Sequence, residues 1–294
     1  MPRIDPCNSP ARNRLVWCGK SAEGTFIQFK QFTSNVNILL CNVGYLLNNR
    51  DFLGGYLPRP RGAILGNPAG ELSATEDIVD IIVEHKPDAV GLVEVDQGSF
   101  RTITDGQVAM IRQLLTEKGM DYHGTIFGKY GPHTMTGRLP FFSHLGNAIL
   151  LKNPEKAVPR YLTTGMKRLV IEAPLTDQYT LLLAHLSVRA RSRRQQLREL
   201  ASLINEEYAG EKVILAGDFN TYLGRQEFEE FIDQTGFSIS IPGKTLHSRP
   251  FDELLLETRS IDLFLTSPTV EVDHSEVVAP PIADHRPALL TINT

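Results

Sequence analysis

Short apolar runs that end in polar residues recur along the chain. Residues 213–216 form one such strand-like run, which stops at Gly217 and is followed by Asp218 and Asn220. In an extended chain, residues two positions apart face the same side. We therefore expect the Asp218 carboxylate and the Asn220 amide to face one point at the mouth of a buried strand. The alternative is an ordinary strand-to-turn cap, where Asp and Asn are common.

The rest of the pattern predicts strands that alternate with amphipathic helices. A Ser-x-x-Glu capping box at residues 73–76 predicts the start of a helix that ends before Pro87. Apolar residues at helical spacing predict three further helices, at 107–118, 191–208 and 227–234. Strands are expected at 36–43, 89–95, 122–127, 147–151, 169–173, 179–186, from 213, 260–266, 271–278 and 288–292, with long loops at 45–70 and 129–144.

This order of elements indicates an α+β protein with one main domain. Strands that follow one another directly interrupt the strand–helix alternation, so the sheets are expected to be mixed rather than all parallel. The 294 residues contain no repeat, low-complexity tract or linker, which favours a single domain at 36–294. Residues 1–35 are expected to form an N-terminal arm that includes a hairpin at 15–32.

The amino-acid composition of the chain argues against several classes of protein. A formal net charge of −4 argues against broad electrostatic capture of a polyanion, although local basic patches are compatible with it. Three scattered cysteines are too few for a disulfide framework or a cysteine-rich zinc site. The chain has no secretory signal and no apolar run long enough to span a membrane, so we expect a cytoplasmic protein.

Polar side chains follow most of the apolar runs, and their types suit a hard cation. A carboxylate beside a buried run needs a cation, a hydrogen-bond donor or solvent, and one divalent ion would serve several carboxylates at once. Carboxylate and amide oxygens favour Mg²⁺ or Mn²⁺, while the histidines would bind phosphate or move protons. The residues are Asn42, Glu94, His185, Asp218, Asn220, Asp262, Asp284 and His285.

These motifs, taken in order, resemble the endonuclease/exonuclease/phosphatase superfamily, which includes DNase I-like nucleases, abasic-site endonucleases, sphingomyelinases and inositol-polyphosphate 5-phosphatases. The resemblance runs from about residue 36 to the C-terminus. It implies a four-layer α/β/β/α sandwich, in which two mixed sheets pack face to face with helices outside and the site lies at one edge. The motifs are Val93-Glu94, Gly146-Asn147-Ala148-Ile149-Leu150, Ala184-His185-Leu186, Gly217-Asp218-Phe219-Asn220, Ser260-Ile261-Asp262 and Ala283-Asp284-His285-Arg286-Pro287.

The resemblance also implies a role for each residue. Glu94 would be the principal metal ligand, with Asn42 beside it and Asp284 near the ion. Asp218 would orient or deprotonate the attacking water, and Asp262 would orient the ring of His285. The groups implied to contact the phosphate or the substrate are His185, Asn220, His285, Asn147 and Arg189.

The expected activity is metal-dependent hydrolysis of a phosphate ester, most simply of a phosphodiester or nucleic acid, by in-line attack of water. The abasic-site endonucleases have an acid two residues past the equivalent of Asn42, but this chain has Gly44, which disfavours that activity. A phosphomonoesterase of a small or lipid phosphate and a catalytically silent binding module are the alternatives. No obligate protein partner is indicated.

Three simpler readings of these residues stay open from the sequence alone. His185 could be a core histidine whose ring nitrogens are satisfied by neighbours. Glu94 and Asn42 could be a strand end and a turn cap. The arginines that begin at Arg189 could form a solvated helix face rather than a contact with phosphate.

Overall fold

The computed structural model describes residues 35–46, 68–100, 102, 106–140, 142–154, 156–222, 224–246 and 260–294. The expected arm and hairpin before Asn35 and most of the 45–70 loop lie outside the described residues. The residues from Asn35 to Thr294 form one compact unit.

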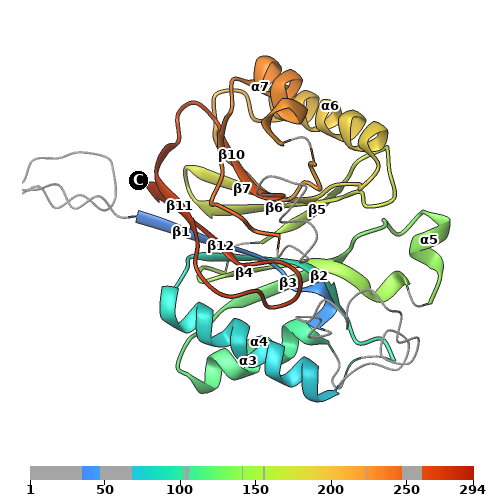
Figure 1. The fold of residues 1–294 in the computed structure, drawn as a ribbon, viewed down its shortest axis with the longest axis vertical. Helices are drawn as coiled ribbons and strands as arrows, with labels where there is room; N and C mark the ends of the chain where they lie inside the picture. Colours follow the sequence, from blue (N-terminus) through green and yellow to red (C-terminus); the bar gives the residue numbers. More distant parts are fainter. Residues whose placement is uncertain are drawn as a thin grey trace, which may run out of the picture. The chain divides into compact units, whose positions relative to one another are not determined.

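Two six-stranded sheets form the centre of this unit (Figure 1). Each contains one parallel pair, β1 with β2 and β7 with β8, and the other neighbours in both sheets are antiparallel. The expectation of mixed sheets is therefore confirmed. The first sheet has the order β11 (Glu271–Val277), β12 (Ala288–Asn293), β1 (Asn35–Asn42), β2 (Ala89–Asp96), β4 (Leu145–Leu151), β3 (His123–Gly128). The second has the order β5 (Val158–Tyr161), β6 (Leu169–Thr176), β7 (Tyr179–His185), β8 (Lys212–Asp218), β10 (Asp262–Thr266), β9 (Ser238–Ser240).

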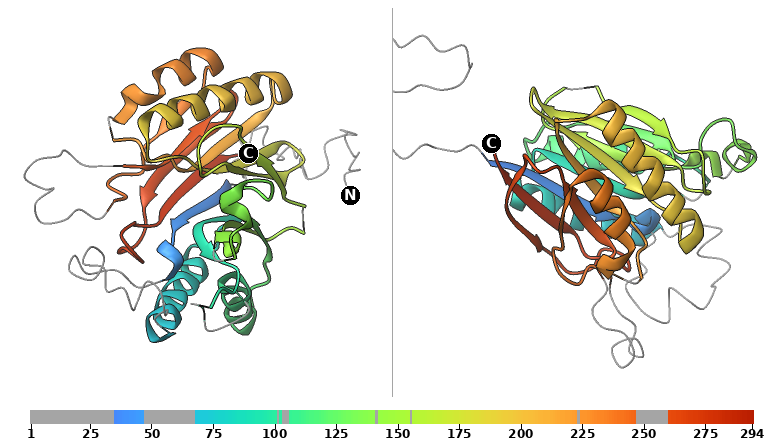
Figure 2. Two further views of the ribbon diagram at one scale, coloured as in Figure 1. Left: turned by 90° about the vertical axis from the view of Figure 1, so that its right-hand side faces the viewer. Right: turned by 90° about the horizontal axis from the view of Figure 1, so that it is seen from above.

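Helices cover the outer faces of both sheets, which confirms the expected four-layer α/β/β/α sandwich. α3 (Pro68–His85) and α4 (Gln107–Glu117) lie on the first sheet, and α6 (Ala190–Glu207) and α7 (Glu229–Thr235) lie on the second (Figures 1 and 2). Shorter helical segments are η1 (Gly44–Leu46), α5 (Met135–Arg138), η2 (Phe142–His144) and η3 (Gly224–Phe228). Among the described helices, none combines the length and apolar composition needed to cross a membrane.

The strands near the middle of each sheet are buried on both faces. In β1, Ile38 and Leu40 belong to the core between the sheets, whereas Leu39 and Cys41 pack with the helices outside. β8 behaves in the same way, with Ile214 facing the other sheet and Leu215 facing α6 and α7. Burial on both faces explains why these strands appear in the sequence as continuous apolar runs rather than as an alternating pattern.

Local differences from the expected elements have physical causes. α3 begins at Pro68, so Ser73 lies inside the helix and the proposed capping box does not open it. The Thr75 hydroxyl instead donates to the Glu71 carbonyl one turn earlier. β5 was not expected, because its four residues include Pro159 and only every second one is turned inward. The expected 129–144 loop contains α5 and η2.

Gly217 is required by the close approach of β7 and β8. It lies opposite Ala184 in their parallel pairing, and a Cβ at this position would overlap the Ala184 carbonyl oxygen. Both strands are central in the sheet and cannot move apart without breaking the core.

We predict that Gly217→Ala lowers the free energy of unfolding by about 3 kcal/mol or more, because the overlap is with backbone rather than with a flexible side chain. Urea denaturation measures this. Gly128→Ala is the control, because the atom nearest to its Cβ would be 3.8 Å away. Equal stability of the two variants would contradict the packing argument.

Candidate functional site

The first sheet presents four polar side chains along one edge. Asn42 is the last residue of β1, and Glu94 lies near the end of the neighbouring β2. Asn147 comes from β4 on one side, and its Oδ1 accepts a hydrogen bond from the Glu94 backbone N at 3.2 Å. His285 precedes β12 on the other side. The strand order therefore places them in the row His285, Asn42, Glu94, Asn147.

The second sheet presents a matching row. His185 and Asp218 are the last residues of the parallel strands β7 and β8 and lie opposite each other in their pairing. Asp262 is the first residue of the antiparallel strand β10 and pairs with Asp218. The ends of two apolar runs and the start of a third, which are far apart in the sequence, thus lie side by side.

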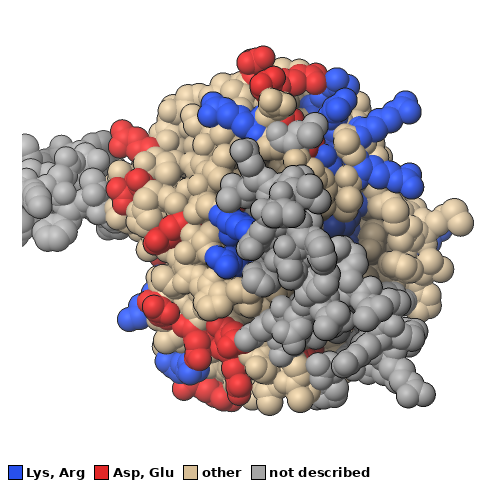
Figure 3. All heavy atoms as spheres, viewed as in Figure 1, with Lys and Arg blue, Asp and Glu red and all other residues tan. Residues whose placement is uncertain are grey.

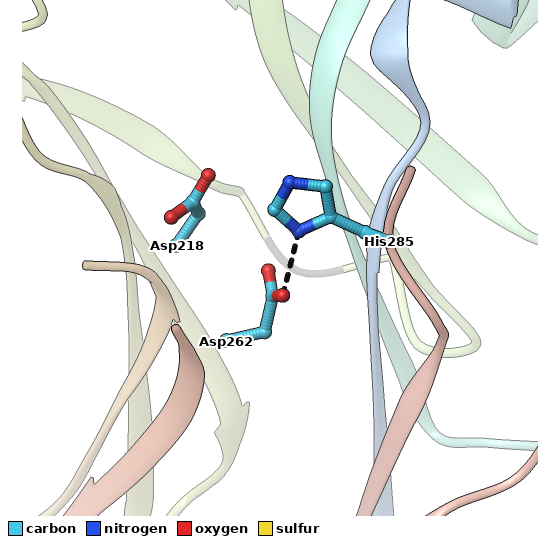
Figure 4. Close-up of side chains that lie close together, drawn as sticks. All are labelled: Asp218, Asp262 and His285. Atoms are coloured by element: carbon cyan, nitrogen blue, oxygen red, sulfur yellow. Dashed lines mark hydrogen bonds and ion pairs between the residues drawn. The ribbon is translucent and has the colours of Figure 1, made fainter. Parts of the chain in front are cut away.

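Hydrogen bonds join the two rows across the gap between the sheets. Asn42 Nδ2 donates to Asp218 Oδ2 at 3.0 Å, and His285 Nδ1 lies 2.7 Å from Asp262 Oδ2. Figure 4 shows the His285 ring facing the two carboxylates of the other sheet. One ligand atom from each of these three residues lies within 4.8 Å of the other two.

Asn220 reaches this cluster by a turn rather than by strand alternation. Its φ is 50°, so the backbone turns back after Phe219 instead of continuing as a strand. The Asn220 backbone N donates to Asp218 Oδ1 at 2.9 Å, and its side-chain Nδ2 donates to the Leu186 carbonyl at 3.0 Å. The two residues are therefore in contact through the Asn220 backbone, and the extended chain expected from Asp218 to Asn220 is wrong at Asn220.

Glu94 is displaced from the regular strand by a bulge. The β2–β4 register shifts between Leu92 and Val95, and Glu94 has a φ of 61°. Its side chain faces two lysines that were not among the predicted site residues. Lys129 Nζ lies 3.3 Å from Glu94 Oε1, and Lys167 Nζ lies 3.7 Å from the same oxygen. Lys129 directly follows β3 and Lys167 shortly precedes β6, so both come from strand ends at this same edge.

Burial and neighbouring charges shift the pKa values of His285, Asp218 and His185 in different directions. Burial alone would lower the pKa of His285, but the Asp262 carboxylate raises it to about 10, so the ring is protonated at neutral pH. Burial raises the pKa of Asp218 to about 6, and the nearby Asp262 adds to this. Burial, followed by the Lys167 ammonium, holds the pKa of His185 well below its usual value. His185 is therefore neutral and Asp218 is mostly ionised at neutral pH.

The remaining predicted residues are less buried or have structural partners. Asp284 is 64% exposed, with Oδ1 3.9 Å from His285 Nε2. Arg189 is exposed at the start of α6. Arg193 of the same arginine group is buried, and its Nε donates to Glu227 Oε2 at 2.7 Å, so this member of the group stabilises the fold rather than facing a substrate.

Solved structures share this fold. An endonuclease/exonuclease/phosphatase family protein from Leptotrichia buccalis C-1013-b matches with a TM-score of 0.62 and 14% identity, covering 88% of this chain and 100% of that one. TDP2 of D. rerio in complex with a single-strand DNA product has a TM-score of 0.58 and 19% identity, covering 89% and 100%. The mannosyl-6-phosphatase Bt3783 from Bacteroides thetaiotaomicron VPI-5482 has a TM-score of 0.59 and 12% identity, covering 88% and 100%.

A comparison of the sequence with models of protein families identifies the family of this chain. The sequence model of the endonuclease/exonuclease/phosphatase family matches residues 37–285, which include all the strand-end residues described above. The chain belongs to the endonuclease/exonuclease/phosphatase family. The resemblance drawn from the motifs is thereby confirmed. Comparison with curated proteins finds no match.

Members of the endonuclease/exonuclease/phosphatase family are generally metal-dependent phosphoesterases. The cluster of Asp218, Asp262 and His285 is a possible metal site in this chain. A protonated imidazole has no free lone pair for a metal, so oxygen donors have to supply most of the ligands. Asn42 and Glu94, at the ends of neighbouring parallel strands, provide an amide and a carboxylate oxygen that suit a hard divalent ion.

The His285–Asp262 pair predicts how stability depends on pH. Because the pKa of His285 in the folded protein lies above that of the free side chain, the pair stabilises fully below about pH 6.5 and its contribution is lost as the pH rises to about 10. Lys129 acts in the opposite sense, because burial lowers its pKa to about 8. The wild type and an Asp262→Asn variant both retain Lys129, so the contribution of Lys129 to the pH dependence cancels when the two are compared.

We predict that the metal-free wild type loses more stability between pH 7 and 9.5 than Asp262→Asn does, because an amide cannot raise the pKa of His285. Urea denaturation in the presence of a chelator measures the difference. Parallel pH profiles for the two proteins would show that Asp262 does not hold the His285 proton.

Proposed function

We propose that this protein hydrolyses phosphate esters by direct in-line attack of water, with bound Mg²⁺ or Mn²⁺. The observation that carries the proposal is the convergence of Asn42 and His285 from one sheet with Asp218 and Asp262 from the other, 3.0 and 2.7 Å apart across the gap. A phosphate ester is anionic, so attack by water requires a base for the proton and fixed positive groups for the developing charge.

The protonation states of Asp218 and His285 support a proposal for the proton transfers. Asp218, with a pKa near 6, is ionised enough at neutral pH to orient the water and accept its proton. His285 is protonated and can donate to a phosphate oxygen or to the leaving group, while Asp262 fixes its ring through Nδ1. Neutral His185 and the Asn220 amide are proposed to contact the phosphate oxygens. No covalent intermediate is required.

Glu94 and Asn42 are the residues proposed to hold the divalent ion, with the exposed Asp284 nearby. The ion would supply positive charge against the phosphate oxygens. Asn42 would keep two contacts in this role, because its Nδ2 already donates to Asp218 and its Oδ1 accepts from the Gly44 backbone N at 3.1 Å. These bonds fix the amide plane in the site.

Two substrate classes are represented among the similar structures, since one contains a DNA product and another is named a phosphatase. A nucleic acid is one candidate substrate, because basic side chains could bind its phosphate backbone. Figure 3 shows Lys and Arg gathered at the upper right, where α6 lies, while Asp and Glu gather at the top over α7 and along the left and lower left. The exposed arginines at and after the start of α6 are Arg189, Arg191, Arg194 and Arg198.

A test uses bis-p-nitrophenyl phosphate and p-nitrophenyl phosphate with Mg²⁺, Mn²⁺ or EDTA. We predict metal-dependent turnover that Asp218→Asn and His285→Ala each lower by about 10²- to 10⁴-fold, the usual contribution of a general base or acid. Steady-state rates and circular dichroism are compared for each variant.

The controls are Asp273→Asn and His274→Ala, two exposed residues of β11 that contact each other. They should retain the wild-type rates. Undiminished turnover in Asp218→Asn or His285→Ala would remove the mechanism. A folded wild type that is inactive on these esters, on nucleic acid and on phosphoinositides would favour the silent binding module.

A further inference from the structure

Lys129 and Lys167 place two ammonium groups against one corner of the site. Both lie within 3.7 Å of Glu94 Oε1. Lys167 Nζ also contacts His185 Nε2, and Lys129 Nζ contacts the Tyr45 hydroxyl. The roles proposed above for metal and water do not use either lysine.

Lys129 is held rigidly by the fold. Its side chain is 2% exposed, and its Nζ lies 4.7 Å from the ring centre of Tyr45 and 5.3 Å from that of Tyr130. Its backbone carbonyl accepts a hydrogen bond from the Arg168 backbone N at 3.0 Å. This bond joins the end of β3 in the first sheet to the residue just before β6 in the second. The backbone segments that carry the two lysines are therefore joined directly.

Lys167 is also positioned from α6. Gln196, which is fully buried, donates to the carbonyl of Thr164 at 3.0 Å and to that of Lys167 at 2.5 Å. Its Oε1 accepts from the Ser187 backbone N at 2.9 Å, two residues past His185. The segment that carries Lys167 is thus tied to the segment that follows β7. The ammonium group is aimed at the site and is not a freely moving surface charge.

An ion pair with Glu94 alone does not explain why two lysines lie beside the same carboxylate. One ammonium satisfies a single carboxylate, and a second near the same oxygen adds desolvation and repulsion between like charges. An anion that joins them would remove this repulsion. Since Lys167 touches His185, which is proposed to contact the reacting phosphate, the anion in question is that phosphate and not a neighbouring one.

The charge of the whole site supports a doubly charged phosphate. Four carboxylates face it, and each needs positive charge nearby to offset it. The two lysines offset two of these carboxylates, so that more of the charge of a divalent ion is left for an anionic substrate. A phosphodiester carries one negative charge, whereas a monoester carries nearly two at neutral pH. The four carboxylates are Glu94, Asp218, Asp262 and Asp284.

We propose that Lys129 and Lys167 bind the non-bridging oxygens of a phosphomonoester, and that this chain is a phosphomonoesterase. The assignment rests on the proposed phosphoesterase function and specifies its substrate class. Of the phosphodiester and the phosphomonoester, the lysines favour the monoester, because their two ammonium groups would lie beside the reacting phosphate, which is more negative in a monoester.

The test compares kcat/KM for p-nitrophenyl phosphate and bis-p-nitrophenyl phosphate, which share a leaving group, under the same metal and pH. The wild type should prefer the monoester. Lys167→Met and Lys129→Met should each lower its kcat/KM by roughly 10- to 100-fold, the loss expected for a hydrogen bond to a charged group. The diester rate should fall much less. Lys152→Met is the control, because Lys152 pairs with Asp88 at 3.0 Å, next to the other end of β4.

Binding supplies a second readout that does not depend on turnover. Calorimetric titration with inorganic phosphate should show weaker binding to Lys167→Met, while its affinity for Mn²⁺ stays within a few-fold of the wild type. An equal loss of Mn²⁺ affinity would mean that the lysine acts on the metal site and would overturn the assignment. Lys167 is partly exposed, so this variant decides the question if Lys129→Met does not fold.

The other outcomes separate the two proposals. A wild type that prefers the diester, or lysine variants that lose both activities equally, overturns the monoester assignment and leaves the phosphoesterase function standing. Absence of metal-dependent turnover on either ester, with normal folding, counts against the proposed function itself.

Discussion

Two hydrogen bonds between the sheets determine the rest of the site. The bonds from Asn42 to Asp218 and from His285 to Asp262 each join residues of different sheets, 176 and 23 positions apart in the sequence. Neither hydrogen bond could form if the strands of the two sheets did not present their polar residues at the same edge. The parallel pairs β1–β2 and β7–β8 bring their carboxyl ends to one edge, and the packing of the sheets then sets the gap between the rows.

The cost of burying polar groups at this edge explains its chemistry. A buried carboxylate or ammonium is unfavourable unless opposite charges and hydrogen bonds compensate. Here the compensation divides the protons unequally, leaving His285 charged, His185 neutral and Asp218 close to its titration range. In the proposed function, the same groups would exchange their present partners for a metal ion and a phosphate, which offer similar charges. A structure tuned in this way is suited to substrate binding as well as to stability.

Much of the fold could be predicted because the central strands are buried on both faces and stand out as apolar runs. Asp218 and His185 could be recognised because each directly follows such a run. Lys129 and Lys167 were missed, although they also adjoin predicted strands, because lysine at a strand end is common on exposed surfaces and the sequence does not show that Lys129 is buried. The bulge that turns Glu94 and the φ of Asn220 depend on pairing partners that are distant in the sequence.

We propose that both sheets together build one site for a divalent ion and a phosphate. Crystals soaked in Mn²⁺ and examined by anomalous diffraction test it most directly, because the signal locates the ion without assumptions about activity. We predict a peak within coordination distance of the Glu94 carboxylate and the Asn42 amide oxygen, at the edge shared with Asp218. A peak elsewhere on the molecule, with none at this edge, would contradict it.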